Sequence, residues 1–258
     1  MRLSISILFS FCLLLSYQSE LVIDESLVTS PNEHIKVAFG LDKGKAYYQV
    51  RFQNEVVIDT SYLGFEFIED KSLGSNLEVL TVDISTYSET WEMPWGEQRE
   101  VQNNYNQLTI NLKEQGENGR RISVVYKVYD DGLGFRYEIP EQDGWSEVLI
   151  KDEHTEFNLT QDYKTFWIPG DWDIYEHLYS TTKLSEIDAK SYIERTNLAQ
   201  SYIPENAVNT PVTMVGENGL HLSFHEASLV DYAGMTLKVD TENLNLKSNL
   251  VGSRNTGL

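Results

Sequence analysis

Three carboxylates follow a glycine near the middle of the sequence. Segment 166–177 reads FWIPGDWDIYEH and places Asp171, Asp173 and Glu176 within six residues. Oxygen ligands at such short spacing around a turn suit Ca²⁺, which takes about six to eight of them. An EF-hand is excluded because its ligand pattern and its glutamate at the twelfth position are absent. On these residues alone, a calcium site and an acidic loop with ordinary caps and turns are equally good interpretations.

Two other groups of residues could also do chemistry. His225 and Glu226, with Asp231, offer acid and base groups, although a structural hydrogen bond is the commoner role of such side chains. Trp91 and Trp95 lie in the segment TWEMPWGE, and aromatic faces stack well on sugar rings. The more common alternative is that both tryptophans fill the core or a seam between domains. Neither group decides a function by itself.

The common catalytic motifs are missing from the sequence. No Gly-rich phosphate loop follows a predicted strand, and neither a Gly-x-Ser-x-Gly elbow nor a His-Glu-x-x-His helix motif occurs. Phosphate-loop, serine-hydrolase and zinc-protease chemistries are therefore not indicated.

The elements that must position these residues are strands. Apolar residues alternate with polar ones over 35–41 and 48–52, and segments 108–112 and 122–129 flank a Gly-containing turn. Only 182–192 could form a helix of two or three turns, and its apolar spacing is weak. Many short strands with turns between them predict an all-β fold, a large antiparallel β-sandwich with few short helices.

Composition narrows the class of protein. Acidic residues outnumber basic ones by 40 to 20, for a formal net charge of −20 at pH 7. Such a surface repels a phosphate backbone, so nucleic-acid binding is disfavoured. Hydrophobic residues make up 41% of the chain, enough for a real core. No Pro- or Ser-rich linker divides the chain, so we expect one domain over 25–258, and a (β/α)8 barrel of about 250 residues does not fit beside these strands.

Residues 1–19 are predicted to be a secretory signal. A short positive start precedes an apolar run from Leu3 to Leu15, and polar residues follow. The run is short for a membrane-spanning helix, which needs about 20 residues. The alternative is a buried N-terminal strand or helix. The only cysteine, Cys12, lies in this run, so the mature chain would contain no disulfide. We expect an exported protein, periplasmic or extracellular, without a transmembrane segment.

Eight short segments occur in a specific order along the chain. They are 30–32 (SPN), 89–97 (ETWEMPWGE), 103–108 (NNYNQL), 130–138 (DDGLGFRYE), 166–173 (FWIPGDWD), 183–187 (KLSEI), 209–212 (NTPV) and 225–232 (HEASLVDY). Together and in this order they resemble glycoside hydrolase family 97, which comprises Bacteroidetes-type α-glucosidases and α-galactosidases. The resemblance runs over most of the chain.

The resemblance implies a β-supersandwich that packs against a (β/α)8 catalytic barrel. In that family the barrel mouth holds the active site and a Ca²⁺ ion bound by glutamates. One ligand comes from the sandwich, in the loop after the Trp-Ile-Pro-Gly-Asp segment, and Glu176 is the matching position. The other ligands, the general acid and the base or nucleophile belong to the barrel. The resemblance therefore implies no catalytic residue in this chain.

The predicted function follows from this division. Glycoside cleavage needs two carboxyl groups that flank the bond, and Glu176 alone cannot supply both. We expect a non-catalytic domain of an exported hydrolase of α-linked oligosaccharides, which contributes Glu176 and a wall of the active-site cleft. Family members continue with further strands and the barrel, so we expect the last strands to be incomplete and the barrel to be absent.

Two other functions remain open at this stage. The first is a stand-alone carbohydrate-binding module with Trp91, Trp95, Trp167 or Trp172 as stacking platforms. The second is an assembly domain without sugar contact, in which the aromatic loops pack between domains. The choice between glucoside and galactoside, and between inversion and retention, would be made in the barrel.

Overall fold

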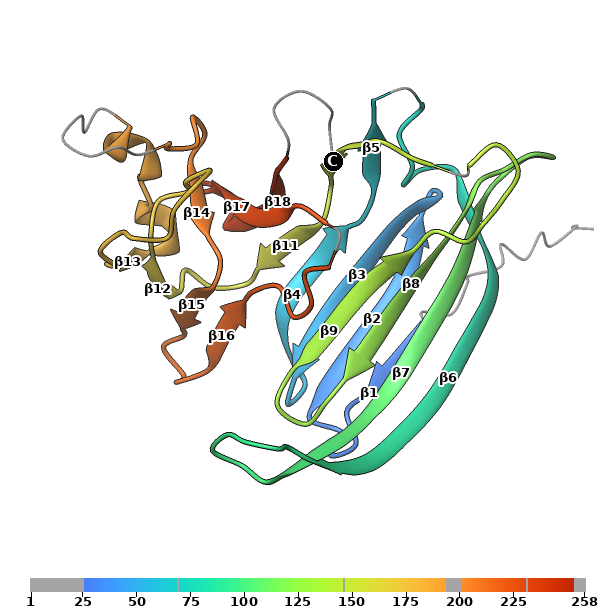
Figure 1. Cartoon of the computed structure of the whole chain (residues 1–258), viewed down its shortest axis with the longest axis horizontal. Helices are drawn as coiled ribbons and strands as arrows, with labels where there is room; N and C mark the ends of the chain where they lie inside the picture. Colours follow the sequence, from blue (N-terminus) through green and yellow to red (C-terminus); the bar gives the residue numbers. More distant parts are fainter. Residues whose placement is uncertain (1–25, 69, 146, 194–200, 231, 253–258) are drawn as a thin grey trace, which may run out of the picture.

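The computed structural model describes residues 26–252 apart from 69, 146, 194–200 and 231 (Figure 1). Its regular elements are almost all antiparallel strands. They are β1 (Ser26–Thr29), β2 (Ile35–Asp42), β3 (Lys45–Phe52), β4 (Glu55–Tyr62), β5 (Phe65–Phe67), β6 (Leu77–Glu92), β7 (Glu100–Glu114), β8 (Arg121–Val128), β9 (Leu133–Glu138), β10 (Ile150–Glu153), β11 (Glu156–Leu159), β12 (Lys164–Trp167), β13 (Ser180–Lys183), β14 (Ala207–Asn209), β15 (Val212–Val215), β16 (His221–Phe224), β17 (Gly234–Asp240) and β18 (Asn245–Val251). The predicted all-β antiparallel fold is confirmed.

Two sheets form the main sandwich. The larger has eight strands in the order β1-β2-β3-β4-β11-β18-β17-β14, and the facing sheet has four in the order β6-β7-β8-β9. In Figure 1 the blue strands β1 to β3 lie behind the green strands β7 to β9. Contacts across the layers join β1 to β7 and β2 to β8. The core therefore lies between the first strands of the large sheet and the four-stranded sheet.

Strand alternation decides which side chains enter this core. Every second residue of a strand points to the same face, and on β2 the side chains of Ile35, Val37 and Phe39 are buried while Lys36 and Ala38 between them are half-exposed. The rings of Tyr48, Tyr126 and Phe135 meet between the sheets, with centroids 5.3–6.0 Å apart. Aromatic pairs at this separation add to the free energy of burial.

Both predicted hairpins are confirmed. The apolar segments 35–41 and 48–52 lie in β2 and β3, which pair along their full length. At their turn Lys43 and Gly44 have φ of 50° and 79°, the left-handed pair that a two-residue hairpin turn requires. Segment 108–112 lies in β7 and pairs with β8. These elements form because the turn residues and the alternation agree with each other.

A second, smaller sheet lies beside the sandwich, at the left in Figure 1, with the order β13-β12-β15-β16. A helix of two or three turns does not form over 182–192. That segment instead ends β13 and continues as two 3₁₀ turns, η1 (Leu184–Glu186) and η2 (Ala189–Tyr192). Ile187 follows η1 in extended conformation, with φ −67° and ψ 119°, which breaks the helix. In the part of the chain that the structure describes, no helix is long and apolar enough to cross a membrane.

Strands β6 and β7 are longer than the sequence pattern indicates. They pair over their whole length, from Leu77 opposite Glu114 to Glu92 opposite Glu100. Strand β8 covers β7 only as far as Asn106, so the remainder projects from the sandwich as a hairpin arm, residues 87–105 (Figure 1). The rings of Tyr87 and Tyr105 stack at its base, with centroids 4.9 Å apart.

Candidate functional site

The loop that contains the three expected carboxylates is anchored by Asp171. This residue is buried, and its Oδ1 accepts hydrogen bonds from the backbone N–H groups of Asp173 at 2.9 Å and Ile174 at 3.2 Å. Its Oδ2 accepts from the N–H of Ser201 at 3.2 Å and lies 3.2 Å from Nε2 of His177. Both oxygens are thus engaged within the loop, so Asp171 is an anchor of the loop and not a free ligand.

The far end of the loop is held by His177. Its side chain is only 4% exposed, and its ring stacks on Tyr202 with centroids 5.3 Å apart and planes 28° apart. Asp173 accepts a hydrogen bond from the hydroxyl of Ser201. For Asp171 and Asp173, the interpretation as ordinary turn carboxylates is therefore the correct one.

Glu176 differs from both neighbouring carboxylates. It is exposed, and among the described residues it has no hydrogen-bond or ion-pair partner. Nor does the described chain bring three His, Cys, Asp or Glu side chains together as a metal site. Glu176 can supply one carboxylate to a Ca²⁺ ion, which takes about six to eight oxygens. The remaining ligands of such a site would have to come from elsewhere.

Exposed apolar side chains are frequent in the loop of Glu176 and in the loop after β16. Tyr175, Leu178 and Tyr179, in the same loop, are 57%, 91% and 59% exposed. Leu229 and Val230, in the loop after β16, are 50% and 75% exposed. Exposed large apolar side chains in groups are typical of contact surfaces.

The two loops lie close enough to influence each other electrostatically. Partial burial, and then the charge of Glu226, raise the pKa of Tyr175 above its usual value. Glu226 accepts a hydrogen bond from the backbone N–H of Met235 at 2.8 Å. Burial raises the pKa of Glu226 above its usual range, and the charge of Glu153 adds to this effect. His225 faces the backbone oxygen of Glu226 at 3.2 Å, not its carboxylate. The predicted pair is therefore not a joined acid–base couple, and Asp231 lies outside the described residues.

The sequence analysis missed Glu153. This residue ends β10 and is only 9% exposed. Its carboxylate accepts hydrogen bonds from the hydroxyl of Tyr232 at 2.8 Å and from Oγ1 of Thr155 at 2.5 Å. Burial is the main cause that raises its pKa above the usual range. No motif marks Glu153, because its burial arises from strands that are distant in sequence. Hereafter Glu153, Glu226 and Tyr232 are called the carboxyl cluster.

The tryptophans divide into two groups. Trp91 and Trp95, on the hairpin arm, are 47% and 82% exposed, so the prediction that they fill the core of this chain is wrong. Trp167 is buried, and its Nε1 donates a hydrogen bond to Oγ1 of Thr182 at 3.0 Å. Trp172 is half-buried. Of these four tryptophans, only the two on the hairpin arm are exposed.

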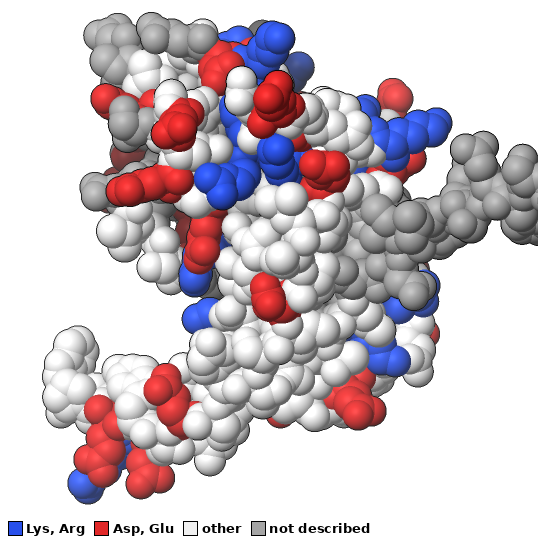
Figure 2. Space-filling model, turned by 90° about the vertical axis from the view of Figure 1, so that its right-hand side faces the viewer, with Lys and Arg blue, Asp and Glu red and all other residues white. Residues whose placement is uncertain are grey.

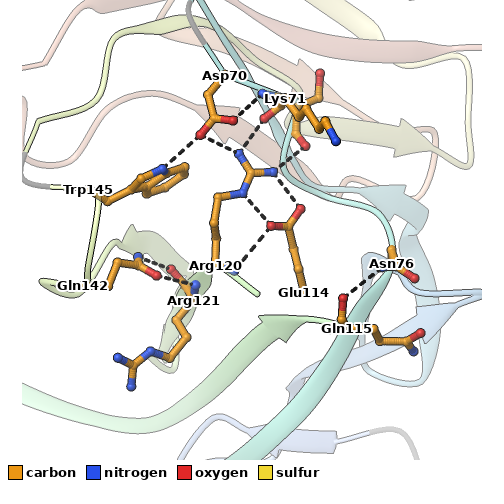
Figure 3. Close-up of polar contacts among 10 residues, drawn as sticks. Asp70, Lys71, Asn76, Glu114, Gln115, Arg120, Arg121, Gln142 and Trp145 are labelled. Carbon is orange, nitrogen blue, oxygen red and sulfur yellow. Dashed lines mark hydrogen bonds and ion pairs between the residues drawn. The ribbon is translucent and has the colours of Figure 1, made fainter. Parts of the chain in front are cut away.

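A different charged cluster, around Arg120, has the features of a structural brace (Figure 3). The Arg120 side chain is 12% exposed and makes a two-pronged contact with Glu114 at 2.5 and 2.6 Å. It also lies 3.2 Å from Asp70 and donates to the backbone oxygens of Lys71 and Ser72. The ring of Trp145 covers the guanidinium at 5.0 Å. All sides of the cation are occupied, so it offers no site for a ligand.

Comparison with known proteins gives two kinds of match. Residues 28–255 match the family model described as glycosyl-hydrolase 97 N-terminal. The chain is also similar to a glycoside hydrolase family 97 enzyme from Pseudoalteromonas sp. strain K8 in complex with acarbose, with TM-score 0.76 and 32% identity over 87% of this chain. A variant of that enzyme in complex with panose matches equally well. A β-arabinopyranosidase shares the fold, with TM-score 0.74 and 20% identity over 87% of this chain. This chain spans 32% of the Pseudoalteromonas enzyme and 35% of the arabinopyranosidase.

Proposed function

Because the chain belongs to the glycosyl-hydrolase 97 N-terminal family, we propose that it is the non-catalytic sandwich part of an exported α-glycoside hydrolase. In this proposal it contributes Glu176 to a calcium site and a wall of the active-site cleft. The observation that carries the proposal is the exposed, unpartnered carboxylate of Glu176 on a loop held at both ends, by Asp171 and by His177. Such a loop can present a ligand without reorganising.

The surface around Glu176 supports docking of the (β/α)8 barrel. Tyr175, Leu178 and Tyr179 are exposed in the same loop as Glu176, and Leu229 and Val230 are exposed in the loop after β16. Burial of these side chains under a barrel would stabilise the complex by about 25 cal/mol for each Å² of apolar surface removed from water. The barrel would at the same time bring the carboxylates that complete the calcium shell.

The substrate class in this proposal is an α-linked oligosaccharide. The similar Pseudoalteromonas enzyme has been solved with acarbose and with panose. A bound calcium ion would add positive charge that orients sugar oxygens and changes the acidity of nearby carboxyl groups. The residues of this chain would hold the ion from one side and exclude water there. The acid and the base or nucleophile would come from the barrel.

A chimera tests the role of Glu176. The corresponding third of the Pseudoalteromonas enzyme would be replaced by this chain, and Glu176→Gln would be compared with Glu97→Gln, an exposed glutamate on the hairpin arm. We expect Glu176→Gln to lower both bound calcium, measured by mass spectrometry, and the hydrolysis of p-nitrophenyl α-glucoside at least tenfold. Glu97→Gln should change neither. Unchanged calcium content in the Glu176→Gln chimera would contradict the assignment.

The isolated chain tests the division of labour. The purified protein is expected to release no p-nitrophenol from α-glucosides or α-galactosides, because in this proposal the acid and the base or nucleophile that flank the bond come from the barrel. Reproducible hydrolysis that survives further purification would overturn the proposal.

A stand-alone carbohydrate-binding module is the second candidate, and the exposed indoles of Trp91 and Trp95 favour it. Isothermal titration with maltooligosaccharides distinguishes the two functions. Millimolar or tighter binding that is lost in Trp95→Ala would favour the module. An assembly domain without sugar contact is favoured instead if sugars leave tryptophan fluorescence unchanged.

The proposed export, to the periplasm or the outside of the cell, depends on the predicted signal in segment 1–19, which lies outside the described residues.

A further inference from the structure

The free edge of the four-stranded sheet is long and unprotected. Strand β6 has 16 residues and is the terminal strand of that sheet. Among the strands that the structure describes, only β7 pairs with it. Proteins usually protect such an edge with lysine, proline, bulges or a covering segment. Strand β6 contains neither lysine, arginine nor proline, and its single irregularity lies between Val79 and Thr81.

Apolar side chains of β6 are exposed on the face that should be buried. Val82 and Ile84 lie opposite Ile110 and Leu108 of β7, which are fully buried in the core. Yet Val82 is 40% and Ile84 is 61% exposed. Among the described strands, the facing sheet ends at β1, which contacts β7, the neighbour of β6. Leu80, the extra residue at the bulge between Val79 and Thr81, is 46% exposed as well.

The opposite face of the same strand is acidic. Asp83 lies opposite Thr109, and Glu89 lies opposite Asn103, on the side away from the core. Glu78 lies on this outward face too, whereas Glu92 lies on the face of Val82 and Ile84 and pairs with Arg99 at 3.3 Å. Strand β6 itself has four carboxylates and no basic side chain. Figure 2 looks onto this side of the molecule and shows a mostly uncharged surface, with an isolated acidic side chain, between the charged upper part and the charged end of the hairpin.

We propose that β6 is a docking edge for an extended strand of another polypeptide, in which apolar and basic side chains alternate. The unpaired main chain of β6 selects a β-strand as the occupant, since strand addition is a common mode of peptide recognition. The apolar side chains of the occupant would continue the core beside Val82 and Ile84. Its basic side chains would lie beside Asp83 and Glu89, where they meet opposite charge across the ladder.

Charge argues against a second copy of this chain as the occupant. Pairing of β6 with itself would bring together two strands with four carboxylates each and no cation. Each copy also has a formal net charge of −20. Repulsion between like charges on neighbouring strands is destabilising. The docking edge is separate from Glu176 and does not depend on calcium.

The test uses the whole chain and a fluorescein-labelled peptide of twelve residues that alternates Val and Lys. Two controls are the same peptide with Glu in place of Lys and a Val/Lys peptide with alternate backbone nitrogens methylated. The methylated peptide keeps charge and side chains but cannot complete the ladder. We expect both controls to bind at least tenfold more weakly in fluorescence anisotropy. Hydrogen exchange should show new protection within β6 and not elsewhere.

A substitution at the edge separates strand addition from simple charge attraction. Ile84→Asp removes apolar contact but adds a negative charge, so strand addition predicts at least tenfold weaker binding of the Val/Lys peptide. Charge attraction alone predicts tighter binding, which would overturn the proposal. The control is Ile193→Asp, a 40% exposed residue directly after η2, which should leave binding unchanged. Equal binding of the methylated peptide, or self-association that protects β6 without any peptide, would also overturn it.

Discussion

The cluster around Arg120 and the carboxyl cluster each contain a largely buried glutamate, Glu114 and Glu153, but only the first contains a cation. In the first, Glu114 and Asp70 contact one guanidinium, which is itself covered by Trp145 (Figure 3). In the second, Glu153 and Glu226 are partly or largely buried, and no Lys or Arg of the described chain pairs with either.

This difference has opposite effects on the pKa values. At Asp70, burial raises the pKa, but the hydrogen bonds from Lys71 and Trp145 and the charge of Arg120 outweigh it, so the pKa is lowered overall. At Glu153, burial outweighs the hydrogen bonds from Thr155 and Tyr232, and the pKa is raised. The cation makes the first cluster a brace that is complete by itself.

The carboxyl cluster is instead a place where added positive charge would be favourable. A nearby cation stabilises the ionised form of a buried carboxyl group. Tyr175 responds to the charge of Glu226 and directly precedes Glu176. Whether a cation binds at this side of the molecule stays a prediction.

Loss of the Arg120 cation is the largest effect that we expect. Arg120→Ala leaves Glu114 without its partner in a mostly buried position, which should lower the free energy of unfolding by about 3–5 kcal/mol. Urea unfolding followed by tryptophan fluorescence measures this change. The control is Arg99→Ala, because the Arg99–Glu92 pair is 79% and 61% exposed and such pairs contribute about 0–1 kcal/mol. Equal losses of unfolding free energy in the two variants would contradict the claim that the Arg120 cluster stabilises the fold more than an exposed ion pair does.

The turn that presents Arg120 should also be sensitive. A Cβ at Gly119 would lie 1.8 Å from the backbone oxygen of Glu114, which is closer than any real contact. Gly119→Ala must therefore rebuild the turn, and we expect a loss of about 1–3 kcal/mol in unfolding free energy. Gly132→Ala, where a Cβ would meet nothing within 4 Å, is the matched control. A neutral Gly119→Ala would show that the brace tolerates a shifted turn.

The smallest expected effect is a pH dependence that belongs to Glu153. The pKa of Glu153 is raised in the folded chain above its usual value of 4.5. Just above pH 4.5 the carboxyl group is therefore still protonated in the folded state but already ionised in the unfolded state. The contribution of Glu153 to the free energy of unfolding is therefore fully present below pH 4.5, and it is lost as the pH rises through the raised pKa. Glu153→Gln should remove this decline, which we expect to be on the order of 1 kcal/mol, because an amide does not titrate. The measurement is the difference in unfolding free energy between wild type and variant from pH 4 to pH 8. A difference that does not change with pH would show that Glu153 is solvated like a surface carboxylate.

The local strands were predictable because their signals are local. The alternation over 35–41 and 48–52 and the turn between them agree, so the hairpin of β2 and β3 follows from neighbouring residues. Segment 182–192 was the one candidate for a helix of two or three turns, on weak apolar spacing, and this expectation was wrong because two 3₁₀ turns form there instead. The length of β6 was not predictable, because its exposed residues alternate poorly and it is held by pairing with β7.

The candidate site was predictable only in part. The spacing of Asp171, Asp173 and Glu176 drew attention to the loop, yet spacing does not tell which carboxylate is already bonded. Contacts with Ser201 and His177 engage Asp171 and leave Glu176 exposed. Whether Glu176 binds calcium stays a prediction.

By itself, the sequence determined an acidic, all-β chain with its hairpins and a segment order similar to one family, since alternation, turn residues and composition act between near neighbours. Only the tertiary structure decided which charged groups are neutralised. Asp70 and Trp145 meet Arg120 from distant segments, and Glu153 meets Tyr232 across 79 positions. Burial and pairing of charge depend on such distant contacts, and these set the pKa values and the free carboxylate on which the proposed function rests.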